Sequence, residues 1–305
     1  MLCWRLFVSQ NTGCQRVKTM RRTSVSCYLL LCLSVACTSA PIPRAGPPLP
    51  PSTPTPTPAV GVSGPWSFNY TAGSTSYQIS RSAAIESQSD SGPHREISTN
   101  TTHELLTFEP VGDTIRFTAL IDSFSTTTQG VIGPVQSVRL PTQFSGTFVG
   151  DSLILTSDSL SEKCDPASSA LIGDLRNLLV HFPTQLQQGN SWRDSVELKS
   201  CQAMIPTTAQ IIRSFVVLGD TDYQGEAMLT VQRIDTIRAH GEGAQQQHRL
   251  TLDATGTGTA LYLLRPADGH VAHVTTGQDL TIEITTSGRT HHFKQSSKQE
   301  LSVVR

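Results

Sequence analysis

The last hundred residues of the chain are long runs of alternating polar and apolar side chains, and this pattern restricts the fold more than any other feature. Turn signals at Gly219-Asp220, Gly241 to Gly243, Asp268-Gly269 and Ser287-Gly288 separate the runs. Strands joined in succession by short turns form an antiparallel meander, whose sheet often has one polar face. The sequence therefore predicts long antiparallel strands over residues 206–218, 226–239, 247–264, 270–286 and 289–304.

Further strands are predicted in the first half of the body, where apolar residues again alternate with polar ones. One hairpin signal, Gly150-Asp151, lies between two such segments. The segments are Trp66 to Tyr70, a strand that begins near Tyr77 and Ile79, residues 115–119, Phe144 to Val149, and Leu153 to Thr156.

One segment breaks the strand pattern and predicts an amphipathic helix over about 166–182. Asp165 is a good N-cap and Pro166 fits the first helical position, while Pro183 ends the helix. An apolar stripe has to cover something, and we expect it to lie on the open face of the sheet, with Asn177 toward solvent. The fold class is therefore mainly β: a long-stranded antiparallel curved sheet, half-barrel or sandwich, with one amphipathic helix packed on it.

The N-terminal region has the features of an export signal, which we assign to residues 1–37. Arg21 and Arg22 precede a largely apolar stretch, Thr23 to Ala36, that is too short to span a bilayer as a stable helix. Met20 is a candidate for the true start, because residues 1–19 add nothing that a signal peptide needs.

A Pro/Thr-rich segment follows over residues 38–62, with proline alternating with Thr or Ser. This composition predicts an extended, semi-rigid spacer of about 3.1 Å per residue. The remaining residues, 63–305, contain no second linker of this kind, and about 240 residues fit one β-rich domain.

The end of the signal, Leu33-Ser34-Val35-Ala36-Cys37, resembles the bacterial lipobox. The resemblance implies that Cys37 becomes the acylated N-terminus and anchors the protein to a membrane. The family usually has Leu, Val or Ile three residues before the cysteine, where this chain has Ser34, so ordinary cleavage after Ala36 and secretion remain the alternative. Under the family's sorting logic, Thr38 in place of Asp implies the outer membrane.

Three features of the body resemble uncharacterised bacterial envelope lipoproteins. They are the helix ending at Phe182-Pro183, the phrase Gly189-Asn190-Ser191-Trp192, and the Gly-Thr-Gly strand running into Asp268-Gly269. Those proteins are similar in turn to the half-barrel lipoprotein carriers, in which helices plug a curved sheet. The resemblance implies an architecture and carries no catalytic residue across.

The body contains two cysteines, Cys164 and Cys201. Outside the cytosol we expect them to oxidise, so the sequence predicts a disulfide that fastens the helical segment to the sheet. The alternative is a pair of buried thiols that never meet.

Metal sites are poorly supported by the histidine and aspartate patterns. His270 and His273, like the adjacent His291 and His292, have odd spacings that point to opposite faces of a regular strand, so a surface or rim position is favoured. Residues Asp220 to Gly225 resemble the opening of a calcium loop, but the position that needs Glu is Val231, which favours a hairpin turn.

Other kinds of site are also poorly supported. Gly256-Thr257-Gly258 lacks the strand–turn–helix context of a phosphate loop and fits places of sheet curvature or close approach. Aromatic residues make up 6% of the chain without basic interleaving, so no nucleic-acid partner is expected. Four aromatic residues are candidates to line a ligand cavity, although core packing is favoured for them: Trp66, Trp192, Phe144 and Phe148.

These patterns favour a non-catalytic binding or structural module of the cell envelope. We expect it to accommodate an apolar ligand or to contact an envelope partner, without cofactor or metal. The alternative is an exported hydrolase with a dispersed His/Asp/Ser site.

Overall fold

The computed structural model describes residues 64–89, 92–112, 114–130, 140–149, 152–155, 166–202, 205–245, 248–266 and 269–304. The predicted export signal, the whole predicted spacer over residues 38–62, Cys37 and Cys164 lie outside these residues.

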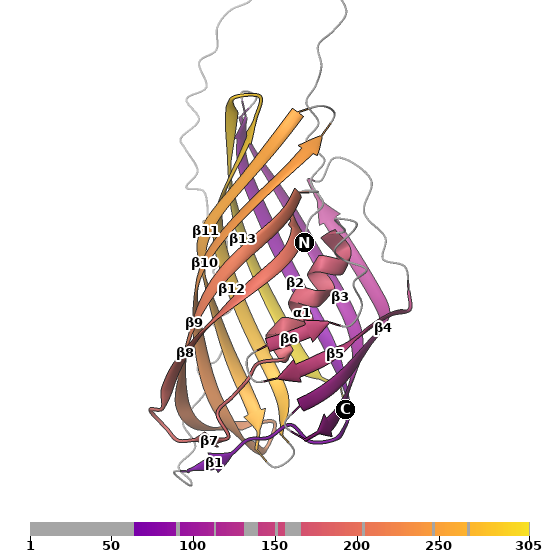
Figure 1. Cartoon of the computed structure of the whole chain (residues 1–305), viewed down its shortest axis with the longest axis vertical. Coiled ribbons are helices and arrows are strands. Elements are labelled where there is room, and N and C mark those ends of the chain that lie inside the picture. The colour runs from indigo at the N-terminus through magenta and orange to yellow at the C-terminus, as the bar shows by residue number, and fades with distance from the viewer. Residues whose placement is uncertain are drawn as a thin grey trace, which may run out of the picture. The chain divides into compact units, whose positions relative to one another are not determined.

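Eleven strands form one antiparallel sheet in the order β6-β5-β4-β3-β2-β13-β12-β11-β10-β9-β8 (Figure 1). Neighbours in the sheet are neighbours in the chain except at β13 and β2, where Leu301 lies opposite Ile79. The strands are β2 (Gly73–Ser89), β3 (Gly92–Val111), β4 (Thr114–Gln129), β5 (Thr142–Val149), β6 (Ser152–Leu155), β8 (Ser191–Gln202), β9 (Ile205–Tyr223), β10 (Glu226–Gln245), β11 (His248–Arg265), β12 (His270–Thr286) and β13 (Arg289–Val303).

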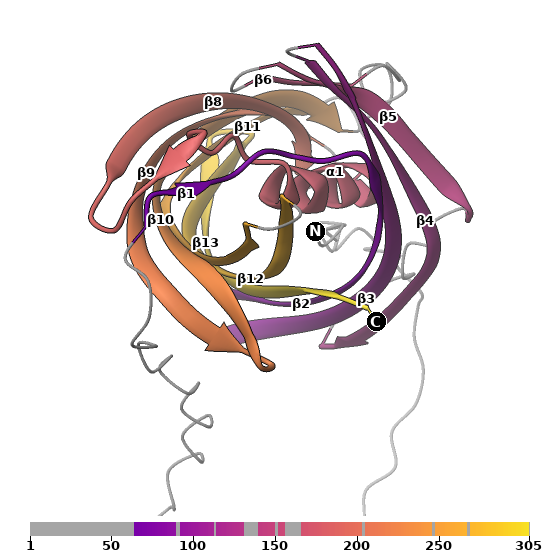
Figure 2. The same cartoon turned by 90° about the horizontal axis from the view of Figure 1, so that it is seen from below.

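The sheet curls into a half-barrel whose free edges are β6 and β8 (Figure 2). The helix α1 (Pro166–Leu178) connects these two edge strands in the chain and lies inside the curl. A second, two-stranded sheet of β1 (Trp66–Ser67) and β7 (Gln185–Leu186) lies at one end. The predicted mainly β fold with one packed helix is confirmed, in its half-barrel form.

Two of the predicted strand breaks are wrong, because glycines lie within strands that continue. Gly219 lies inside β9 at a register shift against β10, with a φ of +114°. The strand then runs on to a turn at Gln224-Gly225, where both residues have positive φ. Gly241 to Gly243 likewise lie inside β10. Ser287-Gly288 forms a hairpin turn as predicted.

The concave face of the sheet is mainly apolar and the convex face is polar. Along β10, Val231 and Ile237 are buried on the concave side, while Thr236 and Arg238 are exposed on the convex side. This alternation with period two places the core inside the curl. The convex face, rich in Ser and Thr, is suited to contact with water.

The core fills one end of the curl. Concave residues that lie directly opposite one another in neighbouring strands form a fully buried row there: Val231, Tyr262, Val274, Leu301 and Ile79. The ring of Phe182 packs edge-on against that of Tyr262 with centroids 5.5 Å apart. On its other side, Phe182 packs against Phe68 at 5.2 Å. Close packing of this kind leaves little space at this end.

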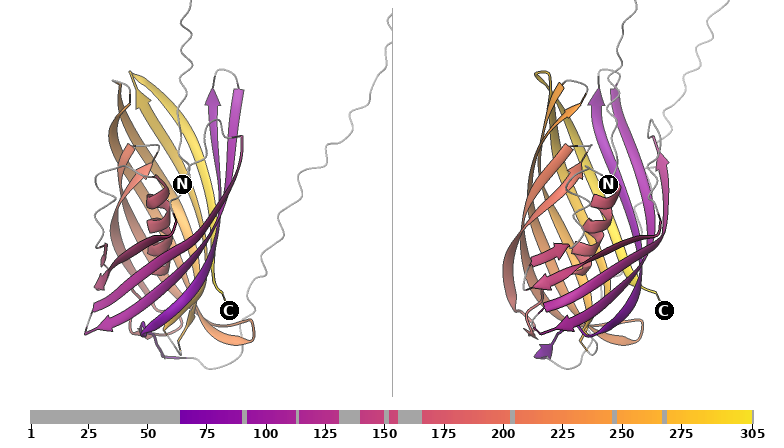
Figure 3. Two further views of the ribbon diagram at one scale, coloured as in Figure 1. Left: turned by 90° about the vertical axis from the view of Figure 1, so that its right-hand side faces the viewer. Right: turned by 45° about the vertical axis from the view of Figure 1, so that its right-hand side comes forward.

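The helix α1 is shorter than predicted, since it ends at Leu178 and Phe182 lies beyond it. Leu171, Leu175 and Leu178 are buried, and no α1 residue from Ser169 to Leu178 is exposed. Figure 3 shows that α1 lies within the curl of the sheet. The expectation that Asn177 faces solvent is wrong. Its side chain points to the sheet, where it forms hydrogen bonds with Arg233 and Gln299.

Among the described residues, no helix has both the length and the apolar character needed to cross a bilayer.

Candidate functional site

A cavity of about 430 Å³ lies between α1 and the concave face of the sheet. Its lining comes from α1, from β2 and from all strands between β8 and β13. Residues on both faces of β8, from Ser195 to Ser200, belong to the lining. The cavity therefore reaches the free edge of β8.

The strand register explains why space remains here. Two rows of directly opposed concave residues carry small or aliphatic side chains at this level, and all of them except Gly256 and Ala254 line the cavity. The first row contains Val196, Ile211, Ile237, Gly256 and Leu280, and the second contains Leu198, Ala209, Ala239 and Ala254. Alanine in the middle of the second row is too short to fill the space toward α1, so the curl stays unfilled at this level.

A belt of polar residues separates the cavity from the packed core. We define the polar belt by the concave residues Asp194, Arg213, Arg233, Asp235, Thr276, Gln299 and Arg81, which lie in two adjacent rows across the sheet. Buried charges need partners, since an isolated buried charge costs several kcal/mol. The belt supplies them.

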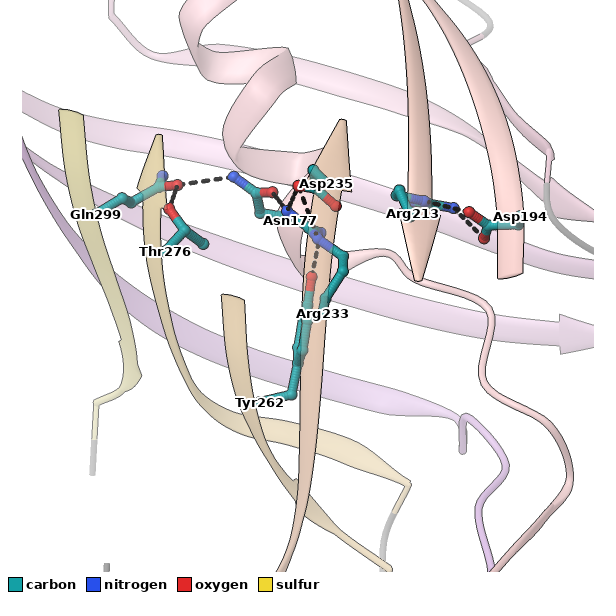
Figure 4. A network of polar contacts seen from close by, with 8 residues as sticks. All are labelled: Asn177, Asp194, Arg213, Arg233, Asp235, Tyr262, Thr276 and Gln299. Atoms are coloured by element: carbon teal, nitrogen blue, oxygen red, sulfur yellow. Dashed lines mark hydrogen bonds and ion pairs between the residues drawn. The ribbon is translucent and has the colours of Figure 1, made fainter. Parts of the chain in front are cut away.

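Two ion pairs lie on the side of the belt formed by β8, β9 and β10 (Figure 4). Arg213 donates from Nε and Nη2 to the two carboxylate oxygens of Asp194, at 2.7 and 2.6 Å. Arg233 donates from Nε to Oδ2 of Asp235 at 3.1 Å and also donates to the hydroxyl of Tyr262. Gly258 lies opposite Asp235, and a Cβ there would come within 3.0 Å of Asp235 Oδ2, so the glycine leaves room for the carboxylate.

The belt also binds the helix. Arg233 Nη2 donates to Oδ1 of Asn177 at 3.1 Å, and Asn177 Nδ2 donates to Oε1 of Gln299 at 2.8 Å (Figure 4). Gln299 Nε2 in turn donates to Oδ1 of Asp174 at 2.6 Å, and Asp174 also pairs with Arg81. Hydrogen bonds from three strands therefore fix the depth of α1 in the curl.

Two charged side chains, Asp235 in the polar belt and Arg176 in α1, have polar atoms without a partner among the described residues. Asp235 Oδ1 is buried and has no hydrogen-bond partner among the described residues, and burial raises the pKa of Asp235 while Arg233 opposes the shift. Arg176, in the last turn of α1, is half-buried and lines the cavity. Burial lowers the pKa of Arg176, and the nearby positive charge of Arg213 lowers it further.

The histidines do not form a site in this cavity. All nine lie among the described residues, and none of them lines it. His273 Nδ1 lies 2.8 Å from Ser302 Oγ, and its Nε2 lies 4.0 Å from Glu300 Oε1. His292 pairs with Glu283 at 3.3 Å. Within the described part of the chain, no group of three metal-binding side chains comes together.

Two other motifs from the sequence, the calcium-loop-like segment and the Gly-Thr-Gly segment, lie within or next to strands of the sheet. Asp220 to Gly225 contains the end of β9 and the turn to β10, with Gly225 N donating to Asp222 Oδ1 at 3.2 Å, so the hairpin interpretation is confirmed. Gly256-Thr257-Gly258 lies within β11, and a Cβ on Gly256 would overlap the carbonyl oxygen of Asp279. Gly256 therefore lies where neighbouring strands approach closely, as expected.

The four aromatic cavity candidates belong to the core. Trp192 stacks on Phe215 with ring centroids 4.8 Å apart, and Phe144 and Phe148 are buried. Trp66 packs against the core from β1. None of the four lines the cavity.

The polar belt was missed at the sequence level, although a signal was present. In β9 and β10, apolar and polar residues alternate along the strand. Arg213, Arg233 and Asp235 occupy positions at which this alternation places apolar, buried residues. A charged residue in that phase indicates a buried charge that needs a partner.

Comparison with known proteins gives fold likenesses alone. No protein-family model matches the chain, and no curated protein matches its sequence. Among solved structures, Neisserial surface protein A (NspA) has 9% identity and a TM-score of 0.19, covering 76% of this chain and 99% of that one. The translocator domain of autotransporter NalP from Neisseria meningitidis has 9% identity and a TM-score of 0.20, covering 77% and 89%.

A third solved structure is a putative outer membrane lipoprotein-sorting protein domain from Vibrio parahaemolyticus, with 11% identity and a TM-score of 0.16, covering 75% of this chain and 83% of that one. Similarity at this level carries no inference about function.

Cys201 lies buried near the end of β8, where its backbone N–H donates to Oγ of Ser169 at 3.0 Å. Ser169 is in the first part of α1, five residues after Cys164 in the chain. The contact brings the start of α1 to Cys201. Cys164 lies outside the described residues, so the disulfide stays a prediction.

We expect Cys164 and Cys201 to be bridged in protein isolated from its native compartment. The enclosed loop of about 37 residues predicts a stabilisation of roughly 3–4 kcal/mol in the chain-entropy model. Alkylation without reduction, followed by mass spectrometry, should leave both cysteines unmodified. Recovery of both as alkylated thiols would exclude the bridge.

A buried carboxyl group gives the fold a pH dependence. Glu104 in β3 is fully buried, neither of its oxygens has a hydrogen-bond partner among the described residues, and burial raises its pKa from 4.5 to about 8. Between these two values the folded state binds a proton that the unfolded state has lost. Stability therefore falls as the pH rises through this window.

We expect Glu104→Gln to remove this dependence. In urea titrations, the free energy of unfolding of the parent should fall between pH 5 and 8, relative to the variant, by at most about 1.4 kcal/mol per pH unit. Glu197→Gln, an exposed change on β8, is the matched control and should leave the slope unchanged. Parallel curves for parent and Glu104→Gln would contradict the assignment.

Proposed function

We propose that the chain is an exported, lipid-anchored binding protein of the cell envelope that takes an apolar or amphiphilic ligand into the cavity between α1 and the sheet. The observation that carries the proposal is the cavity itself. Its volume of about 430 Å³ is within the usual range of small-ligand sites, and its walls combine aliphatic residues with many polar ones, including the charged residues of the polar belt.

A non-catalytic role is part of the proposal. The cavity lining contains no histidine, and of its two carboxylates Asp235 is paired with Arg233 while Glu197 is exposed on β8. The specific observation that favours a hydrolase is the contact of His273 with Ser302, but Glu300 is 4.0 Å from the ring and mostly exposed. Neither His273 nor Ser302 lines the cavity, so the binding role is better supported.

The anchor is proposed from the sequence. Acylation at Cys37 would hold the domain at a membrane, with the outer membrane favoured, and residues 38–62 would separate it from the surface. Secretion after ordinary cleavage is the alternative.

Replacement of Cys37 by Ser tests the anchor. We expect the variant to lose incorporation of radioactive palmitate and to leave the membrane fraction, because the acylated residue would be gone. Unchanged labelling and unchanged membrane retention would show that the segment is a plain secretion signal.

A pair of adjacent residues on β9 tests the ligand site. Ala209 lines the cavity, whereas Gln210 is exposed on the convex face. Measured on the Cys37→Ser chain, which would carry no acyl group of its own, Ala209→Phe should weaken saturable binding of a hydrophobic dye at least ten-fold by filling the cavity. Gln210→Phe should leave it unchanged.

Extraction with organic solvent provides a second readout. Lipid recovered from the parent protein and lost from Ala209→Phe would support the proposal. If the parent neither yields lipid nor binds the dye, the ligand role fails and contact with an envelope partner becomes the better proposal.

A further inference from the structure

Arg176 is the one charged side chain on the α1 side of the cavity that lacks a counter-ion among the described residues. Arg81 pairs with Asp174, Arg213 with Asp194, and Arg233 with Asp235. Each belt carboxylate therefore already has its own arginine. Arg176 has no such partner among the described residues, although it lines the same cavity as Arg213, whose positive charge lowers the pKa of Arg176.

Burying the charge of Arg176 is unfavourable, and the dipole of α1 offsets part of this free-energy cost. A cation in the last turn of a helix interacts favourably with the helix dipole. Like charges in a half-buried setting disfavour one another, and burial disfavours the charge itself. A structural role alone does not require a guanidinium that lines a cavity beside a second arginine.

The surroundings of Arg176 define the chemistry of a ligand. Near it lies the polar belt, where Arg213 lines the cavity and the carboxylate of Asp235 is paired with Arg233. On the side away from the core lie the two aliphatic rows through Ile211 and Ala209. One part of the cavity therefore suits an anion and the adjoining part suits a hydrocarbon chain.

We propose that the cavity binds an anionic amphiphile, whose acidic head pairs with Arg176 beside Arg213 and whose acyl chain lies along the rows of Ile211 and Ala209. A guanidinium matches the planar geometry of a carboxylate and the oxygens of a phosphate, and paired hydrogen bonds to a charged group are the strong ones. An anion between Arg176 and Arg213 would also relieve their repulsion. This inference rests on the proposed ligand site and specifies its ligand class.

Paired probes test the head group. A fluorescent undecanoic acid and its methyl ester share one chain and differ in charge, so their dissociation constants isolate the anionic interaction. On the Cys37→Ser chain we expect the acid to bind at least ten-fold more tightly than the ester at low salt.

Arg176→Met removes the charge and keeps an unbranched apolar side chain. It should raise the dissociation constant of the acid to that of the ester and leave the ester unchanged. Arg238→Met, on the exposed convex face of β10, is the matched control and should keep the preference. Thermal unfolding of each variant, followed by circular dichroism, confirms that the fold is retained.

The outcomes separate this inference from the proposed function. Equal binding of both probes by the parent, or a preference that persists in Arg176→Met, overturns the anionic head and leaves the ligand site standing. Binding of neither probe removes both. Displacement of the bound acid by a fatty acid or by a lysophosphatidic acid distinguishes a carboxylate head from a phosphate.

Discussion

A sheet that curls without closing leaves an apolar concave face that its own side chains cannot fill, and the structure depends on how α1 covers it. The sheet is continuous through the pairing of β13 with β2, so its opening lies between β6 and β8, the two strands that α1 connects in the chain. The helix therefore enters the curl where the sheet is open. Leu171, Leu175 and Leu178 meet the core row, and burial of each such side chain contributes roughly 1.5–3 kcal/mol.

The buried ion pairs fix where the helix lies more than they stabilise the fold. The desolvation of two charges offsets much of their attraction, so replacing a buried pair by apolar residues is often neutral or stabilising. Apolar contacts, in contrast, are non-directional and would tolerate a shift of α1 along the curl. The bonds from Asp174 and Asn177 to Gln299, Arg81 and Arg233 tolerate no such shift. They fix the helix at one depth, and with it the floor of the cavity.

The sequence predicted the long strands well because period-two alternation is a local signal. It failed where the decisive contacts are distant in the chain. Gly219 and Gly241 resemble strand breaks locally, yet cross-strand pairing carries β9 and β10 through them. Asn177 was placed toward solvent because a helix on an open sheet has a free face, and nothing local reveals that the sheet wraps around it. The cavity depends on which residues of neighbouring strands lie opposite one another, so the pattern of a single strand could not show it. The polar belt could have been predicted, because Arg213 and Arg233 occupy positions where the alternation of their strands calls for an apolar residue.

The helix itself shows that the empty space is a property of the residues and not a packing accident. Gly173 lies in the middle of α1 and lines the cavity, and a Cβ built on it would meet no atom within 4 Å. Glycine there costs about 1 kcal/mol relative to alanine, with no steric need that explains it. Ala209 and Ala239 line the same cavity from the sheet. Protein interiors are otherwise close-packed. Small residues on both the helix and the sheet around one cavity, together with an arginine that has no counter-ion among the described residues, are what the proposed ligand site requires.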